Sequence, residues 1–204
     1  MIVLSPPFSS DDDRNIKQIL LEGEGTIVYP TETFYALGCA ANSSKAIERV
    51  YQLKHRKKDL PLLILIDSWE MFRDYFVEIS ATQKKLLQKY WPGPLTAVLK
   101  SRNNLSSLLN EKSPYIGVRM TSSVMARDLI KILAAPLVGT SANRSAAAEM
   151  SVLSDVRAVF KNEIDIYIDG GKTPGGQPST VVDMKDSRNF KVIRDGAVGL
   201  LGDI

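Results

Sequence analysis

Two short polar segments hold the residues best suited to chemistry. Residues 30–33, PTET, offer two hydroxyl groups, a carboxylate and backbone donors. Residues 54–58, KHRKK, offer fixed positive charge. Hydroxyl groups and cations that converge on one place can hold a ligand that carries both phosphate and carboxylate groups. We therefore predict an anion-binding site built from both segments.

The elements around these segments are predicted from the spacing of apolar residues. Residues 26–29 form a predicted strand that Pro30 stops, and residues 44–53 a helix with one apolar face. Lys54 falls on that same face, so we expect its amine at the rim of the buried surface. Residues 62–66 are a continuous apolar run, which is typical of a central strand.

Strands and helices alternate along most of the chain, and strands dominate its last part. This order predicts an α/β fold with a twisted mixed sheet, in one domain over residues 1–204. The further strands are expected at residues 2–4, 95–99, 115–119, 135–140, 164–169, 180–183 and 190–194, and the further helices at 11–22, after 67–68, and at 82–90, 122–133 and 152–160.

Polar side chains recur beside the ends of the predicted strands. Ligands of open α/β sheets bind outside strand ends, so we expect these side chains to share one pocket. The glycine patterns of Walker A and dinucleotide sites are absent from the sequence, so a nucleotide would have to bind through a different arrangement of groups. The residues concerned are Thr31, Thr33, Arg56, Arg119, Ser141, Asn143, Ser179 and Arg194.

Each of these features also has an ordinary structural explanation. A basic run is commonly a solvated helix end or an RNA-binding patch. Arginines at strand ends often form structural ion pairs, and residues 141–143 suit a simple turn. His55 is expected at the surface, and Cys39 is expected as a small core residue. The joint pattern, rather than any single residue, favours a binding site.

Composition excludes several classes of site. One cysteine and one histidine leave no disulfide framework, no cysteine metal cluster and no multi-histidine metal site. The formal charge of +3 allows an anionic ligand or RNA without requiring either. The sequence shows neither a signal peptide nor an apolar run near the ~20 residues of a membrane helix, so we expect a cytoplasmic protein without a membrane partner.

An ordered set of motifs resembles the YrdC-like threonylcarbamoyl-AMP synthases. The motifs are YPTETFYALG, KHR followed by Pro61 and Leu62, WPGPLT, GVRM, GTSAN, PSTVVD and VIRDGAV, and they extend from about Gly23 to Val198. The resemblance implies a twisted mixed sheet with helices around a positively charged cavity. It implies that L-threonine, bicarbonate and ATP yield L-threonylcarbamoyladenylate and pyrophosphate. The product would serve threonylcarbamoyladenosine modification of tRNA, together with partner proteins.

The resemblance also assigns roles on the threonine side. Thr33 would hold the amino acid, Arg119 would bind its carboxylate, and Ser179 would line that side of the pocket.

On the nucleotide side, Lys54 and Arg56 would neutralise the phosphates and the charge that develops during catalysis. Ser141 and Asn143 would contact the nucleotide or the carbamate, and Arg194 the nucleotide. Mg²⁺ is expected with the ATP phosphates, held mostly by phosphate and water.

The sequence departs from the family pattern at several positions. Leu60 and Leu65 stand where many relatives carry Asn and His, which removes two polar contacts. Phe34 and Ala36 replace smaller or differently branched residues and should tighten the pocket entrance. Residues 144–149 differ from the common Ser-Gly loop, and residues 144–150 form a candidate mobile loop.

Two alternatives remain open. The first is an RNA-binding protein of the same fold, without synthase activity, that binds double-stranded RNA or tRNA. Sparse aromatic residues near the basic run argue against it. The second is a carbamoyl-transfer domain of the kind found in larger hydrogenase-maturation proteins.

Overall fold

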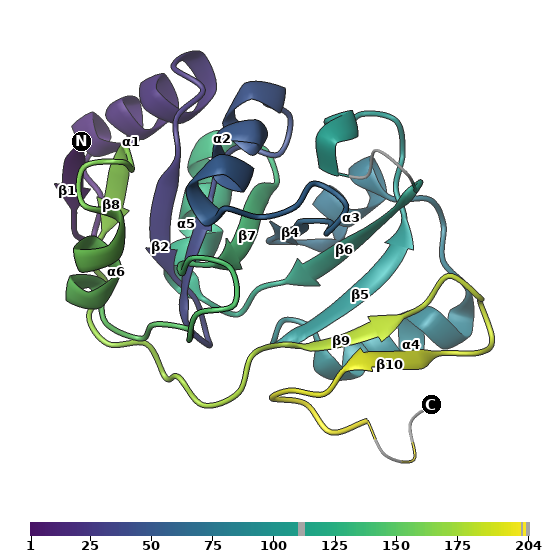
Figure 1. Cartoon of the computed structure of the whole chain (residues 1–204). Helices are drawn as coiled ribbons and strands as arrows, with labels where there is room; N and C mark the ends of the chain where they lie inside the picture. Colours follow the sequence, from purple (N-terminus) through teal and green to yellow (C-terminus); the bar gives the residue numbers. More distant parts are fainter. Residues whose placement is uncertain (110–112, 201, 203–204) are drawn as a thin grey trace.

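Ten strands lie side by side in one twisted sheet (Figure 1). The computed structural model describes residues 1–109, 113–200 and 202. In their order across the sheet the strands are β1 Ile2–Leu4, β8 Ile166–Ile168, β2 Ile27–Pro30, β3 Tyr35–Gly38, β7 Leu137–Ser141, β4 Leu63–Ile66, β6 Tyr115–Met120, β5 Leu95–Lys100, β9 Thr180–Asp183 and β10 Lys191–Arg194.

Neighbouring strands run both parallel and antiparallel, so the sheet is mixed, as the sequence predicts. The strands β2, β3, β7 and β4 pair antiparallel in turn, whereas β4 with β6 and β5 with β9 pair parallel. The position of β4 near the middle of the sheet confirms the central strand expected from its apolar run. The last two strands form the expected antiparallel hairpin.

Serine side chains cap the start of most helices. Ser43 accepts a hydrogen bond from the backbone of Ala46, and Ser9 and Ser80 each complete a capping box. The predicted helices are all present, with ends shifted by a few residues. They are α1 Ser10–Lys17, continued by a π-helical segment Gln18–Glu22, α2 Ser44–Lys54, α3 Trp69–Tyr75, α4 Ala81–Tyr90, α5 Val124–Leu133 and α6 Leu153–Phe160, and a short 3-10 helix spans Ser107–Leu109.

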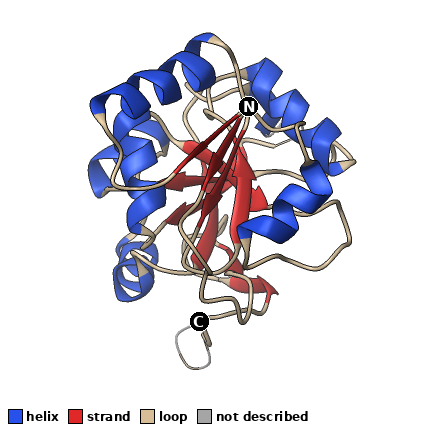
Figure 2. Cartoon of the chain, turned by 90° about the vertical axis from the view of Figure 1, so that its left-hand side faces the viewer, coloured by secondary structure: helices blue, strands red, loops and turns tan. Residues whose placement is uncertain are grey.

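Helices cover both faces of the sheet (Figure 2), and the central strand is buried on both sides. Ile64 and Ile66 pack in the apolar cluster that includes Ile47 of α2. Leu65, which points to the opposite face, packs in the cluster that includes Leu129 of α5. Successive side chains of β4 therefore enter apolar clusters on opposite faces of the sheet. This explains why the strand is apolar at every position instead of alternating between apolar and polar residues.

The stretch from residue 26 to residue 66 holds a strand that the sequence analysis missed. After Pro30 the chain turns and returns as β3, which pairs antiparallel with β2 in the register Pro30 to Tyr35. This strand escapes detection because it is four residues long, buried throughout, and ends in Gly38. A Cβ atom on Gly38 would lie 1.8 Å from the carbonyl oxygen of Val138, so only glycine permits this approach of β3 to β7. The polar segment predicted as a loop is therefore the turn of a β-hairpin.

Candidate active site

A cavity of about 320 Å³ opens over the middle of the sheet. Its floor includes Gly139 of β7, Leu63 of β4 and Gly117 of β6, which are register partners in one row across three neighbouring strands. Two members of this row are glycines in tight places: a Cβ atom on Gly139 would lie 3.0 Å from the Tyr29 hydroxyl and 3.1 Å from Leu65, and one on Gly117 would lie 3.2 Å from Leu63. The sequence analysis expected a pocket outside strand ends; residues beside strand ends, such as Thr31 and Ser179, do line the cavity, and it also extends over the face of the sheet.

The hairpin turn places two threonine hydroxyl groups at one side of the cavity. The Thr31 hydroxyl donates to the carbonyl oxygen of Phe34 (2.7 Å) and lies 3.1 Å from the Thr33 hydroxyl. Because Thr31 has only one hydroxyl proton and has given it to Phe34, Thr33 is the donor within the hydroxyl pair. The Thr33 oxygen keeps its lone pairs, which suits it to accept a hydrogen bond from an amine or a hydroxyl of a ligand.

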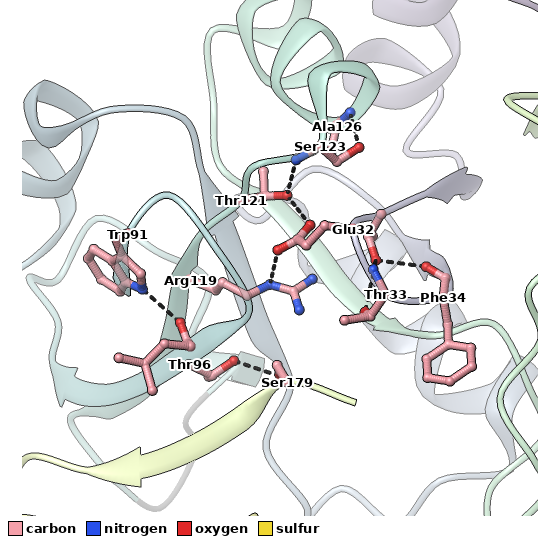
Figure 3. Close-up of polar contacts among 12 residues, drawn as sticks. Glu32, Thr33, Phe34, Trp91, Thr96, Arg119, Thr121, Ser123, Ala126 and Ser179 are labelled. Carbon is pink, nitrogen blue, oxygen red and sulfur yellow. Dashed lines mark hydrogen bonds and ion pairs between the residues drawn. The ribbon is translucent and has the colours of Figure 1, made fainter. Parts of the chain in front are cut away.

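Arg119 of β6 lies on the floor, with only 7% of its side chain exposed. Its Nε atom lies 3.5 Å from Oε1 of Glu32. The two terminal nitrogens point into the space between Thr33 and Ser179 (Figure 3). This forked end is the part of an arginine that binds a carboxylate through two parallel hydrogen bonds.

Ser179 and Arg194 close the cavity from the C-terminal hairpin. Arg194 Nε and Nη2 donate to the carbonyl oxygen of Ser179 at 3.1 and 2.8 Å, and Nη2 also contacts the Ser179 hydroxyl at 3.1 Å. That hydroxyl lies 3.0 Å from the hydroxyl of Thr96. These bonds fix a guanidinium group of the edge strand β10 against the start of β9.

Arg56 comes from the basic segment that follows α2. The helix ends where His55 adopts a left-handed conformation (φ 50°), and this redirects the chain. Arg56 Nε and Nη2 donate to the carbonyl oxygens of Leu60 and Pro61, both at 3.1 Å. The side chain of Arg56 thus holds the conformation of the basic loop to which it belongs.

Among the described residues, the charged groups on the wall of the cavity are three guanidinium groups and one carboxylate, that of Glu149. Burial lowers the pKa of Arg56 and of Arg194, and for Arg194 the charge of Glu149 opposes this while Arg119 and Arg56 add to it. Arginine stays protonated throughout the accessible pH range. Three guanidinium groups held together with one carboxylate are an arrangement suited to binding an anion.

Lys54 lies behind this wall rather than on it. Its amine donates to the carbonyl oxygens of Ser141 and Asn143 and to Oδ1 of Asn143, the last two at 2.8 and 2.9 Å. Oδ1 of Asn143 also accepts from the Ser141 hydroxyl at 2.7 Å. The three oxygen acceptors match the three N–H bonds of an ammonium group. Burial, aided by the charge of Arg56, lowers the pKa of Lys54 to about 7.

The structure brings most of the predicted site residues together. Lys54 was expected at the rim of the buried surface, and this is wrong, because only 1% of the residue is exposed. Asn143 likewise does not line the cavity. These two residues hold the turn that presents Ser141. The predicted residues that do line the cavity are Thr31, Thr33, Arg56, Arg119, Ser141, Ser179 and Arg194.

Sequence analysis did not select three polar residues of the site. Glu32 was noted only as part of its loop, although it stands between two selected threonines. Thr96 belongs to the motif WPGPLT, but no role was assigned to it. Glu149 lies in a segment of small residues, and nothing in its neighbourhood in the sequence indicated a cavity.

The departures from the family pattern fall into two groups. Phe34 and Ala36 line the cavity, as expected for residues at its entrance. Leu60 and Leu65 do not line it. Leu60 is 48% exposed, and Leu65 is fully buried in the core beneath α5. The loss of polar side chains at these two positions therefore leaves the cavity wall itself unchanged.

Within the described residues, no group of three or more His, Cys, Asp or Glu side chains could hold a metal ion. The same part of the chain has no helix of the length and apolar character needed to cross a membrane. A second cavity, of about 560 Å³, lies by α3 and α4 and includes Trp69, Phe72 and Phe76 among its lining residues. Its aromatic lining does not combine arginines with hydroxyl groups, as the first cavity does.

Comparisons with known proteins identify the family of this chain. A family model described as Telomere recombination, for the Sua5, YciO and YrdC proteins, matches residues 19–196. A threonylcarbamoyl-AMP synthase of Chromobacterium violaceum is 32% identical over 89% of this chain and 93% of its own length. One of Pyrococcus abyssi is 35% identical over 80% of this chain. The present chain spans about half of that relative, since the match covers 48% of its length.

A solved structure extends the comparison to three dimensions. The crystal structure of Sua5 from Pyrococcus abyssi complexed with L-threonine superposes with a TM-score of 0.91 at 30% sequence identity. The match covers 98% of this chain and 59% of the Sua5 chain.

Proposed function

This chain belongs to the Sua5, YciO and YrdC family, and on that premise we propose that it is an L-threonylcarbamoyladenylate synthase. Such a nucleotidyltransferase joins L-threonine, bicarbonate and ATP and releases pyrophosphate. The observation that carries the proposal is the convergence of Arg56, Arg119 and Arg194 with the Thr33 hydroxyl in one cavity. An amino acid and a triphosphate together present the carboxylate, amine and phosphate groups that this lining can bind.

The threonine end of the cavity follows from the free hydrogen-bonding groups. The forked end of Arg119 would bind the carboxylate, and the lone pairs of Thr33 would accept from the amine or the hydroxyl of the substrate. Ser179 would complete that side, because its hydroxyl lies between Thr96 and Arg194.

The nucleotide end would use the other two arginines. Arg56 and Arg194 would neutralise the phosphates, and the Ser141 hydroxyl would donate to phosphate or carbamate. Lys54 and Asn143 would act by holding Ser141 in place.

The proposed chemistry needs no nucleophile from the protein. Bicarbonate takes up a proton and loses water to give carbon dioxide. The threonine amine then bonds to the carbon of carbon dioxide and loses a proton, which gives a carbamate. One carbamate oxygen then bonds to the α-phosphorus of ATP as the bond from that phosphorus to pyrophosphate breaks. The protein aligns the reactants, neutralises developing charge and excludes water from a labile carbamate.

We further propose that Mg²⁺ enters with the ATP phosphates. A phosphate-bound magnesium ion keeps several water ligands, so it does not require a cluster of protein carboxylates. Its contribution would be to neutralise phosphate charge, while the arginines orient the same phosphates.

The product would serve tRNA modification together with partner proteins, and we expect this to occur in the cytoplasm. The alternative of an RNA-binding protein without synthase activity is less well supported. Phosphates of an RNA backbone are bulky and lie on the outside of the helix, whereas Arg119 is recessed on the cavity floor.

The test is pyrophosphate release from ATP and Mg²⁺, with L-threonine and bicarbonate omitted in turn. We expect release only when both are present, and L-serine or L-valine should support less of it. ATP turnover that is indifferent to threonine would overturn the proposed function.

A further inference from the structure

A buried carboxylate with no assigned role, that of Glu32, connects the hairpin turn to β6. Its side chain is 12% exposed, and it stands between Thr31 and Thr33 on the turn. Its oxygens point away from these threonines, toward Arg119 and Thr121 (Figure 3). A carboxylate beside an arginine lowers the affinity of that arginine for an anion, so the position of Glu32 next to Arg119 needs an explanation.

The protons around this carboxylate can be assigned without ambiguity. The Thr121 hydroxyl accepts a hydrogen bond from the backbone N–H of Ser123 (3.2 Å). It donates its single proton to Oε2 of Glu32 at 2.6 Å. The Ser123 hydroxyl in turn donates to the carbonyl oxygen of Pro30 at 3.0 Å. The turn and the start of α5 thus hold the carboxylate in one orientation.

That orientation determines which edge of Arg119 stays available. Oε1 of Glu32 and Nε of Arg119 are both buried, have no hydrogen-bond partner among the described residues, and lie 3.5 Å apart. The attraction between the two charges therefore directs the Nε edge of the guanidinium group to Glu32. The forked end, with its two terminal nitrogens, is left facing the cavity.

We propose that Glu32 is a positioning residue that sets the direction of the Arg119 fork and hence the selectivity for a substrate with a free α-carboxylate. The proposal rests on the proposed function, in which Arg119 binds the carboxylate of threonine. Because Glu32 is the chain neighbour of Thr33, one residue links the two groups assigned to the amino acid. The negative charge of Glu32 repels the carboxylate of the substrate, but the affinity gained by orienting the terminal nitrogens of Arg119 exceeds the affinity lost by this repulsion.

The two effects of Glu32 predict opposite results for the isosteric variant Glu32→Gln. If repulsion between the Glu32 carboxylate and the substrate carboxylate is the larger effect, Glu32→Gln strengthens threonine binding. If positioning is the larger effect, Glu32→Gln weakens threonine binding, because a neutral amide oxygen attracts the Nε edge less strongly than a carboxylate does and the fork is no longer held toward the cavity. We expect the second result, with threonine binding weakened about tenfold or more, as for other lost orienting partners.

The experiment compares binding of L-threonine and L-threonine amide, which lacks the carboxylate, to the full chain by calorimetry. In the wild-type protein L-threonine should bind more tightly than the amide. In Glu32→Gln that preference should fall about tenfold while affinity for the amide stays the same. Tighter threonine binding, or an equal loss for both ligands, would overturn the proposal. Glu70→Gln breaks an exposed ion pair with Arg73 on α3 and is the matched control, with no change expected.

A second pair of variants tests the orientation without touching the charge. Thr121→Val removes the hydroxyl that holds Glu32 and should weaken threonine binding, whereas Thr121→Ser keeps the hydroxyl and should bind normally. Equal binding by both variants would contradict the proposal. Failure of the wild-type protein to bind threonine at all would instead refute the proposed function.

Discussion

At the scale of single residues, the most informative difference between sequence and structure is Lys54. The sequence placed it correctly on the buried face of α2, but the burial is complete and the amine is bonded to the turn that holds Ser141. Helical spacing gives the direction of a side chain and cannot show which oxygens it reaches. The role assigned to Lys54 by resemblance, that of neutralising phosphate, stays a prediction.

The titration of Lys54 makes a testable prediction about stability. Burial lowers its pKa to about 7, compared with an ordinary value of 10.5. Between these values the unfolded chain binds a proton that the folded protein does not, so the folded state becomes more stable as pH rises. The difference in unfolding free energy between wild type and Lys54→Met should rise from pH 7 toward pH 10, with a slope of at most about 1.4 kcal/mol per pH unit.

Below about pH 7 both states carry the proton, and the difference should level off. Urea unfolding at a series of pH values provides the measurement, with the fluorescence of the tryptophans as the signal. A difference that stays flat across pH 7 to 10 would show that the Lys54 amine titrates alike in both states.

Glu149 gives a second prediction at this scale. It is the one acidic side chain among the described residues that line the cavity, and its charge acts on Arg194 and Lys54. Removing that charge with Glu149→Gln should leave the arginines freer to bind phosphate and lower the Kd for ATP by about three- to tenfold.

Glu78→Gln, which alters the second cavity instead, is the control for Glu149 and should bind ATP as the wild type does. Weaker ATP binding by Glu149→Gln would mean that the carboxylate itself takes part in holding the nucleotide, directly or through its metal ion.

At the scale of elements, most of the fold could be predicted because the buried runs and the helix caps are local signals. Serine caps and apolar faces located the helices, and continuous apolar runs such as residues 62–66 located buried strands. The missed strand β3 also lies in an apolar run, residues 34–41, but the alanines and the glycine of that run are poor strand formers, and its pairing with β7 cannot be read from the sequence. The need for glycine at position 38 is explained only by the carbonyl oxygen of Val138, which lies where a Cβ atom would be.

Gly38→Ala tests this dependence. The added methyl group would meet the carbonyl oxygen of Val138, so the two strands must separate, and we expect a loss of stability on the order of 3 kcal/mol. Gly199→Ala is the matched control, because no atom lies within 4 Å of the position that its Cβ would occupy. Equal unfolding midpoints for the two variants would mean that β3 and β7 tolerate a wider spacing.

At the scale of the whole molecule, the cavity is assembled from segments that are far apart in the sequence. The sheet order brings the hairpin turn, the basic loop, β6 and the C-terminal hairpin around one space. No spacing along the chain encodes that convergence. The pocket members were selected because polar side chains recur beside the ends of predicted strands, and the family resemblance then gave them roles. The places of Glu149, Gly117 and Gly139 on the cavity wall were not predicted, because they depend on how the folded segments meet.

The central claim is that this cavity joins threonine, bicarbonate and ATP into one molecule. The most direct test supplies L-threonine, ATP, Mg²⁺ and carbon-13 bicarbonate to the protein and analyses the products by mass spectrometry. We predict an adenylate that carries both threonine and the labelled carbon, together with pyrophosphate, and its loss in Arg119→Ala. ATP consumption without any labelled threonine adenylate would contradict the account.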